Sequence, residues 1–493
     1  MSKLQEKENV KMTNHRWTVV LMLFLATTVN YLDRQVLSLT WADFIAPEFH
    51  WTNSDYGTIT GLFSIFYAIS MLFAGKFVDW MDTKKGFLWA IGIWSLGAVL
   101  HAFCGILTAG ITAGEWTLSF LGAREAIGTV GNVSLVVSVS VTLFVFARLV
   151  LAIGEAGNFP AAIKTTAEYF PKKDRGYATG IFNSGAQIGA LLAPLTIPFI
   201  AKAWGWEMAF IVIGALGFVW MGFWVFVYDK PEKHKRVNEV ELAYIIQDDA
   251  RDAVVVEVVT EVTPVGENAG KKVSFKKAFK YKQTWSFAIG KFLTDGVWWF
   301  LLFWIPAYLS AVYGLDSTQS APHVFVVYAI SMISVFAAGY FPAYFMNRKK
   351  MDPYQGRMRS MLLFAFFPLL ILLAQPLGYI SVWVPVIIIG IAAAAHQSWS
   401  ANIFSTVSDM FPKHAVATIT GIGGMAGGVG SFIINKSSGV LFDHAANTNM
   451  KFMGFEGIES GYFIIFCICA FAYLIGWTIM KSLVPKYELI TDM

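Results

Sequence analysis

Long runs of hydrophobic residues alternate along the chain with short polar segments. A helix needs about 20 apolar residues to cross the hydrocarbon core of a bilayer. On this criterion the pattern predicts twelve membrane-spanning helices, at residues 17–44, 55–79, 86–108, 136–163, 176–200, 206–228, 284–312, 322–346, 358–375, 380–408, 415–442 and 459–482. The longest polar interruption, residues 230–283, separates the sixth span from the seventh.

Positively charged residues alternate between the two sides of this predicted topology. With both termini inside, the inner connections hold nearly all of them, including Lys84, Lys85, Lys172, Lys173, Arg175, Arg348, Lys349, Lys350, Arg357 and Arg359. The outer connections hold Arg124, Lys202 and Lys451, with Lys436 at a span edge. Because cytoplasmic loops carry an excess of Lys and Arg, we expect a multi-pass protein of the inner (cytoplasmic) membrane with both termini in the cytoplasm.

Composition agrees with a membrane protein. The chain is 56% hydrophobic and 14% charged, whereas soluble domains contain about 25% charged residues. The net charge of +4 reflects the lysines of the inner loops and does not indicate nucleic-acid binding. Cys104, Cys467 and Cys469 lie in or beside apolar segments, so neither a disulfide framework nor a metal-ligand spacing is expected. The polar N-terminus has no cleavable signal pattern.

The two halves of the chain resemble one another. The segment EYFPKKDRGYATGIFNSGAQIG (168–189) aligns without a gap to DMFPKHAVATITGIGGMAGGVG (409–430). Such repeats are typical of secondary transporters, whose substrate site lies near mid-membrane between two halves. We therefore expect an all-α membrane protein with an N-terminal segment (1–16), a first six-helix half (17–229), a central loop (230–283), a second six-helix half (284–482) and a cytoplasmic tail (483–493).

Several motifs resemble those of the major facilitator superfamily. Gly75, Asp79, Lys84 and Lys85 match its loop motif between the second and third helices, although Asp82 stands where the family usually has Gly. Four further segments resemble the anion:cation symporter branch, and most of all its bacterial hexuronate transporters: NYLDRQ (30–35), RLVLAIGEAGNFPAAIK (148–164), KFLTDGVWWFLLFWIP (291–306) and AHQSWSANIFSTVSDMFP (395–412). The resemblance covers nearly the whole chain except the central loop and residues 105–135.

Several ionisable residues lie well inside the predicted spans, where each charge costs at least about 2.5 kcal/mol. Among them are Asp33 and Arg34 on span 1, Arg148 and Glu155 on span 4, and Lys291 and Asp295 on span 7. The spacing of the span-4 pair is nearly two helical turns, so both side chains are expected on one face. The span-7 pair has the i, i+4 spacing of a local ion pair, so it has either a structural or a functional role.

The charges on spans 1 and 4 predict coupled transport. Arg34 and Arg148 offer planar guanidinium groups suited to a carboxylate. Asp33 and Glu155 can take up a proton when they are removed from water. Protonation of either acid would free an arginine for the substrate, so that substrate and proton bind cooperatively. The family resemblance implies the same roles. The structural alternative is that these charges only pair with one another and lock the helices together.

Polar side chains on other spans complete the predicted sugar-binding pocket, together with Lys291. They are Tyr67, Asn183, Gln187, His396, Gln397, Ser400 and Asn402. Hydroxyl groups of a sugar need hydrogen bonds and its ring needs a flat apolar surface. Trp298 and Trp299 on span 7 can supply that surface or can face lipid, and His396 can equally be a packing residue. The glycines at 421–430 predict close helix packing or a rocking interface.

We therefore expect a secondary transporter that imports a hexuronate such as glucuronate or galacturonate with a proton. The alternative within this class is another organic anion, such as an aldonate or an aromatic carboxylate. An enzyme is not expected, because the chain lacks HExxH, GxSxG and a phosphate loop; a receptor would need a larger soluble domain. No cofactor beyond the coupling proton and no metal are expected, and the chain is expected to be a monomer. Within residues 105–135, the segment GEWTLSFLGAREAIG (114–128) is expected to form a short helix at the membrane surface.

Overall fold

The computed structural model describes residues 11–248 and 275–490. The expected extended run VVVEVVTEV and parts of the N-terminal segment, central loop and tail lie outside these residues. The first part of the chain forms α1 (His15–Thr40), the π-helical η1 (Trp41–Ile45), α2 (Ala46–Phe49), α3 (Asn53–Met81), α4 (Thr83–Thr112), α5 (Phe120–Gly128), α6 (Val133–Glu155), α7 (Asn158–Tyr169), α8 (Lys172–Trp204), α9 (Trp206–Val227), η2 (Pro231–Lys233) and α10 (Glu239–Ile245).

The second part is also almost entirely helical. It forms α12 (Phe275–Ala278), α13 (Lys282–Tyr313), α14 (Ser317–Ser331), α15 (Ser334–Lys349), α16 (Pro353–Phe366), η3 (Phe367–Leu373), α17 (Trp383–Met410), α18 (Lys413–Thr448), β1 (Lys451–Phe452), β2 (Phe455–Glu456) and α19 (Ile458–Leu483). The two short strands pair antiparallel. Each expected span corresponds to one helix or to two consecutive helical segments.

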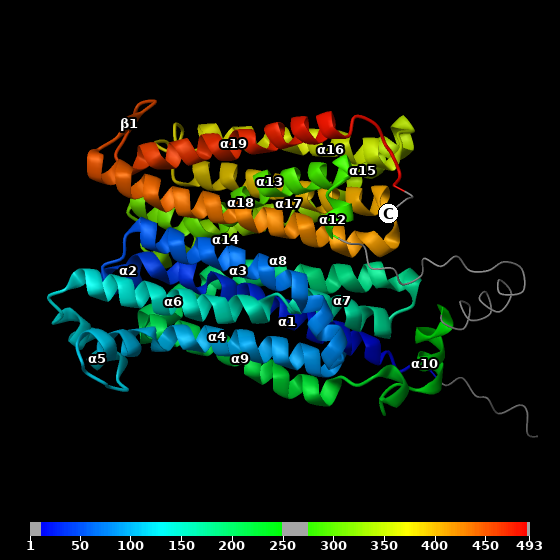
Figure 1. Ribbon diagram of the computed structural model, residues 1–493, viewed down its shortest axis with the longest axis horizontal. Helices are drawn as coiled ribbons and strands as arrows, with labels where there is room; N and C mark the ends of the chain where they lie inside the picture. Colours follow the sequence, from blue (N-terminus) through cyan, green and yellow to red (C-terminus); the bar gives the residue numbers. More distant parts are fainter. Residues whose placement is uncertain (1–10, 249–274, 491–493) are drawn as a thin grey trace, which may run out of the picture.

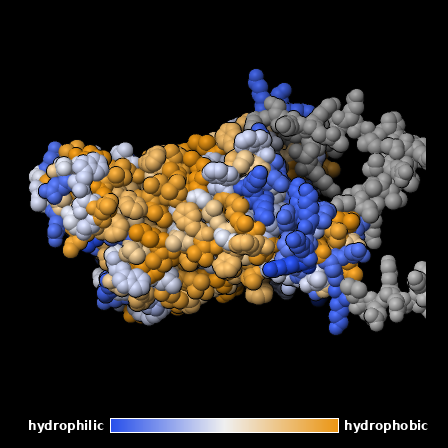
Figure 2. All heavy atoms as spheres, turned by 90° about the horizontal axis from the view of Figure 1, so that it is seen from below, coloured by the Kyte–Doolittle hydropathy of each residue, from blue (hydrophilic) through white to orange (hydrophobic). Residues whose placement is uncertain are grey.

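The long helices lie side by side in one elongated bundle (Figure 1), with α1–α9 along one side and α13–α19 along the other. Within the described residues, eleven helical segments are long and apolar enough to cross a membrane. The 26-residue α1, with its charges, is the twelfth long segment and packs among them. A hydrophobic band lies between two more polar ends (Figure 2), as a bilayer requires. We refer to the end that carries α10 as the loop end and to the end that carries α5 and β1 as the far end.

The sequence repeat has the same structure in both halves. Phe170 and Phe411 are both buried and extended, and each ends a helix. Pro171 and Pro412 follow with φ near −65° and ψ near 150°, and each precedes the first residue of a long helix. Proline suits this position because its missing N–H would be unpaired at a helix start. The shared Phe-Pro-Lys sequence thus produces the same helix–turn–helix twice.

The two halves meet mainly where α3 packs against α18 and α8 against α14. Glycines on α18 allow the close approach that was expected of them. A Cβ at Gly428 would lie 2.3 Å from that of Ala68 on α3, and a Cβ at Gly430 would lie 2.0 Å from the Phe292 carbonyl oxygen on α13. The glycine cluster therefore serves packing both within the second half and between the halves.

Hydrogen bonds tie the two halves together at the far end. The Asp443 carboxylate on α18 accepts hydrogen bonds from the backbone N–H groups of Asn53 and Ser54 at the start of α3. Lys436 donates to the hydroxyl groups of Ser54 and Thr58, at 3.0 and 2.6 Å. These contacts cap the exposed N–H groups of α3 and hold the far end closed.

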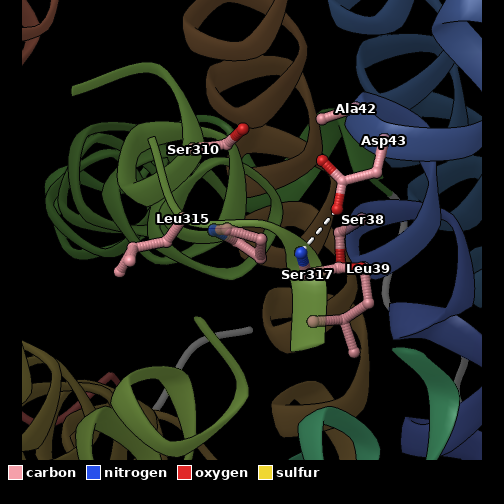
Figure 3. A pocket seen from close by; sticks show the side chains of 8 residues that line it. Ser38, Leu39, Ala42, Asp43, Ser310, Leu315 and Ser317 are labelled. Atoms are coloured by element: carbon pink, nitrogen blue, oxygen red, sulfur yellow. Dashed lines mark hydrogen bonds between the residues drawn. The ribbon is translucent and has the colours of Figure 1, made fainter. Parts of the chain in front are cut away.

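A small cavity of about 10 Å³ lies behind this closure, between the ends of α1 and α13 (Figure 3). Its lining includes Ser38 and Ser310, and the Asp43 carboxylate bridges it by accepting a hydrogen bond from the Ser317 N–H at the start of α14. A space of this size holds about one water molecule, so the ends of α1 and α13 pack closely here.

The segment 105–135 does form a short helix, α5, and α4 extends to Thr112. Arg124 of α5 donates to Glu48 of α2 and to Glu207 of α9, at 2.9 and 3.0 Å. The two carboxylates are almost completely buried, so this arginine fixes α5 onto the far end of the first half. Its expected position at the membrane surface stays a prediction.

Candidate functional site

Glycines bring the charged helices of the first half close together. A Cβ at Gly97 of α4 would lie 2.5 Å from the Leu151 nitrogen of α6, and one at Gly154 would lie 2.2 Å from the Trp94 nitrogen. Gly185 and Gly189 of α8 pack on α1 in the same way: a Cβ at either glycine would lie 2.4 Å from a carbonyl oxygen of α1. Small residues at such positions permit backbone contact between membrane helices, so α6 packs closely on α4 and α1 packs closely on α8.

Arg34 of α1 and Glu155 of α6 form a buried ion pair. The Arg34 Nε and Nη2 atoms both donate to Glu155 Oε2, at 3.0 and 2.6 Å. The Glu155 side chain is 0% exposed, and its second oxygen, Oε1, has no hydrogen-bond partner among the described residues. The carboxylate is therefore only partly satisfied, and it occupies the hydrogen-bonding edge of the Arg34 guanidinium.

Arg148 lies on α6 with Glu155 but has a different environment. Its side chain is buried, yet none of its three guanidinium nitrogens has a hydrogen-bond partner within residues 11–248 and 275–490. The Phe63 ring lies 5.2 Å from its Cζ atom. A buried, unpaired guanidinium is costly, so this arginine is available to bind an anion.

Asp33, the neighbour of Arg34, is likewise buried without a partner in the described parts of the chain. Neither carboxylate oxygen accepts a hydrogen bond. The residue lies within electrostatic range of Glu155 and Arg148, beside the Trp94 indole. The structure thus brings Asp33, Arg34, Arg148 and Glu155 into one cluster between α1 and α6, as the sequence predicted.

Aromatic rings surround the Arg34 guanidinium. Its Cζ atom lies 4.7 Å from the Tyr67 ring centroid and 4.9 Å from that of Tyr31. The Trp299 ring, which belongs to α13 in the second half, lies at 5.0 Å. Rings bind the face of a guanidinium and leave its edge for hydrogen bonds. Tyr67 is thereby placed beside the charged cluster, as expected.

A second pair of buried charges lies within the second half. Lys291 and Asp295 of α13 form the predicted i, i+4 ion pair at 2.7 Å. The Phe404 ring lies 4.2 Å from the ammonium group, and a Cβ at Gly427 would lie 2.2 Å from Asp295 Oδ2. The glycine of α18 therefore makes room for the carboxylate. The ion pair satisfies Lys291, whose substrate role stays a prediction.

His396 of α17 lies near this pair. Its ring stacks on Trp298 with 5.2 Å between centroids, and its Nδ1 atom shares a hydrogen bond with the Tyr473 hydroxyl at 2.7 Å. Trp298 therefore packs within the second half, whereas its neighbour Trp299 faces the first. These contacts hold the imidazole in one orientation, whatever its role in binding.

The remaining predicted pocket residues are spread over several helices. Asn183 is exposed, and Gln187 accepts a long hydrogen bond of 3.5 Å from Ser331 across the two halves. Gln397 and Ser400 are partly buried. Asn402 donates to the carbonyl oxygens of Ala338 and Ser398, so it links α17 to α15. Within the described residues none of these side chains has a hydrogen bond to the Arg34 cluster, and their part in substrate binding stays a prediction.

Sequence reasoning did not select Tyr31 or Phe63 as site residues, and it left Trp299 open between a surface for the sugar and a position facing lipid. Tyr31 precedes Arg34 by three residues and Phe63 precedes Tyr67 by four, which are the spacings of neighbours on one helix face. That periodicity was an available signal for the first two. The described residues contain no group of three or more His, Cys, Asp or Glu side chains placed to hold a metal ion.

A comparison with known families gives the same picture. The model of the Major Facilitator Superfamily matches residues 23–434, which is most of the chain. The chain belongs to the Major Facilitator Superfamily. It therefore has the twelve-helix fold of this superfamily and is a membrane transporter, not an enzyme.

Similar members of the superfamily include bacterial sugar-acid transporters. The hexuronate transporter of Escherichia coli (strain K12) is 26% identical over 480 residues, which cover 96% of this chain and 95% of that protein. The galacturonate transporter of Dickeya chrysanthemi is 27% identical over 343 residues, covering 69% and 86%. Among solved structures, a bacterial homolog of the human lysosomal transporter Spinster is 18% identical with a TM-score of 0.68, covering 97% of this chain and 99% of that chain, a likeness that concerns the fold alone.

Proposed function

We propose that this superfamily member imports a sugar-acid anion, such as glucuronate or galacturonate, by proton symport through alternating access. The observation that carries the proposal is the buried Arg148 guanidinium, which has no hydrogen-bond partner in the described chain. The free-energy cost of burying this unpaired charge is offset if an anion binds to Arg148 during the transport cycle. The names of the similar bacterial transporters support a hexuronate as that anion.

Coupling to a proton follows from the ion pair. In the empty protein Glu155 occupies the edge of Arg34. A proton on Glu155 removes the negative charge that holds this edge, so that Arg34 and Arg148 can bind one carboxylate together. Substrate and proton then favour each other's binding, which is the thermodynamic requirement for symport. Asp33 is the second acid in range and can serve as an intermediate proton acceptor.

The second candidate substrate is another organic anion, because the cluster recognises a carboxylate and not a particular sugar. We further propose that the loop end faces the cytoplasm of the inner membrane, which agrees with its basic loops.

Uptake into membrane vesicles tests the proposal. Radiolabelled glucuronate should accumulate when the outside is made acidic, and an uncoupler should abolish the accumulation. Competition with galacturonate, an aldonate and an aromatic carboxylate identifies the preferred anion. Uptake that is insensitive to the uncoupler would disprove proton symport, and accumulation of only a different anion would select the second candidate.

A further inference from the structure

One contact joins the charged cluster to the opposite half of the protein. The Trp299 ring of α13 lies 5.0 Å from the Arg34 Cζ atom of α1 and is 9% exposed. It also packs against Tyr67 and Phe63 of α3, with centroid distances of 6.0 and 5.8 Å. The other rings around Arg34 all belong to the first half. Trp299 is thus the part of this aromatic enclosure that moves with the second half.

We propose that Trp299 is a positioning residue for transport, which holds the Arg34 guanidinium by its face and directs its edge towards the substrate carboxylate. The proposal rests on the proposed function of the same site. A guanidinium can bind an aromatic face and a carboxylate at the same time, because the two use different surfaces of the planar group. Trp299 therefore does not compete with the substrate for Arg34.

The contact has its effect at the moment of proton uptake. Once Glu155 is neutral, it is a weaker acceptor for Arg34, which has no other hydrogen-bond acceptor within the described residues, and a long side chain that is held less firmly gains rotamer freedom. The enclosing rings keep the guanidinium in the orientation that the ion pair gave it. Because one ring comes from the second half, a relative movement of the halves opens the enclosure and weakens the hold on the anion. The Trp299 ring therefore couples the closure of the two halves to the affinity of the site for the anion.

Substitutions at Trp299 separate this role from simple packing. Trp299→Phe keeps an aromatic face, whereas Trp299→Leu fills part of the space without one. We expect glucuronate affinity to fall by less than about 3-fold in the phenylalanine variant and by roughly 3- to 30-fold in the leucine variant. Because proton and substrate bind cooperatively, weaker binding also lowers the pH at which half of the protein is occupied at a fixed glucuronate concentration, so the pH midpoint of binding should shift to lower pH in the leucine variant.

Titrations of purified protein with glucuronate between pH 5 and pH 8 measure both quantities. Trp285→Leu is the matched control, because Trp285 lies on the same helix but is 47% exposed and far along it from Arg34. It should leave affinity and pH midpoint unchanged. If the leucine variant does not fold, Trp299→Met takes its place, since methionine is flexible, of similar length and not aromatic.

The outcomes distinguish the two proposals. Wild-type affinity in the leucine variant, or equal loss in the phenylalanine and leucine variants with an unchanged pH midpoint, would overturn the role of Trp299 alone. A wild-type protein that binds no sugar acid or other organic anion would overturn the proposed function, and the role of Trp299 with it.

Discussion

Arg34 and Glu155 form a buried ion pair that joins α1 to α6, with 2.6 Å between Nη2 and Oε2. Arg148 lies on the same helix as Glu155 and on the face that the heptad spacing predicts, yet it has no hydrogen-bond partner in the described chain. The cluster therefore contains one arginine that is occupied and one that is available. This difference gives the two arginines distinct experimental signatures.

Arg148→Met should abolish binding of the sugar acid without lowering the stability of the empty protein. The substitution breaks no hydrogen bond. It also removes an unpaired buried charge, whose burial costs free energy of folding. The melting temperature of the purified protein with and without glucuronate measures both effects. Arg34→Met is the comparison, because it leaves Glu155 buried and unpaired and should destabilise the protein by about 3–5 kcal/mol. Equal destabilisation by both variants would contradict this account of Arg148.

Glu155→Gln should abolish accumulation driven by a pH gradient while exchange of labelled for unlabelled substrate continues. The glutamine has the shape of the protonated acid, so Arg34 stays free for the anion, but no proton can be carried. Proteoliposomes loaded with substrate measure exchange, and proteoliposomes with an imposed gradient measure accumulation. Continued accumulation by this variant would remove Glu155 from the coupling mechanism.

The ion pair between Lys291 and Asp295 predicts how substitutions at these residues change the stability of the protein. Removal of one partner, in Lys291→Met or Asp295→Asn, should destabilise the protein by about 3–5 kcal/mol, because a buried charge stays behind. The double variant should recover most of this loss. Thermal unfolding of the three variants measures the differences, and transport by the double variant shows whether the pair also binds substrate. Full recovery of both stability and uptake would assign the pair a structural role.

Asp443→Ala should loosen the closure at the far end. The substitution removes the acceptor of the Asn53 and Ser54 N–H groups, so conformations open at this end become more populated. A cysteine introduced at Ser38, in the small cavity behind the closure, should then react faster with a membrane-impermeant thiol reagent. The same cysteine in the otherwise native protein is the reference. An unchanged rate would show that this contact does not hold the far end closed.

Glu241 of α10 predicts a pH-dependent contact at the loop end. Burial disfavours its charged form, but hydrogen bonds from Thr13, from the His15 and Arg16 N–H groups and from the Arg16 side chain outweigh this effect and lower its pKa. A lowered pKa means that the contact stabilises the fold above the usual carboxyl pKa, near 4.5, and loses this effect as the pH falls through the lowered value.

Hydrogen exchange of the first turn of α1 tests this contact. Protection should be high at pH 7 and should fall in Glu241→Gln, which keeps the shape but weakens the capping interaction with the helix N-terminus. Tyr244→Phe in the same helix is a control that retains the capping carboxylate. Unaltered protection in the glutamine variant would show that α10 does not stabilise the start of α1.

The positions of the helices could be predicted from sequence because each needs a long apolar run, and the repeat could be found because Phe-Pro-Lys fixes one local structure twice. The i, i+4 pair of Lys291 and Asp295 was predictable for the same reason, since both residues lie on one helix. Pairing between helices was not predictable in this way. Which arginine contacts Glu155 depends on how α1 and α6 are rotated, and the glycines of α8 on α1 and of α4 on α6 influence those rotations through contacts between segments distant in sequence.

The balance of charge in the cluster bears on the driving force. Two arginines and two carboxylates, all buried between α1 and α6, sum to zero when every group is ionised. Uptake of one proton with one monoanion leaves that sum at zero, so the loaded protein would change conformation without moving net charge through the membrane field. The free energy of this conformational change would then not depend on the membrane voltage. A second proton per substrate would add one positive charge and about 2.3 kcal/mol of drive for every 100 mV, so the voltage dependence of uptake counts the protons.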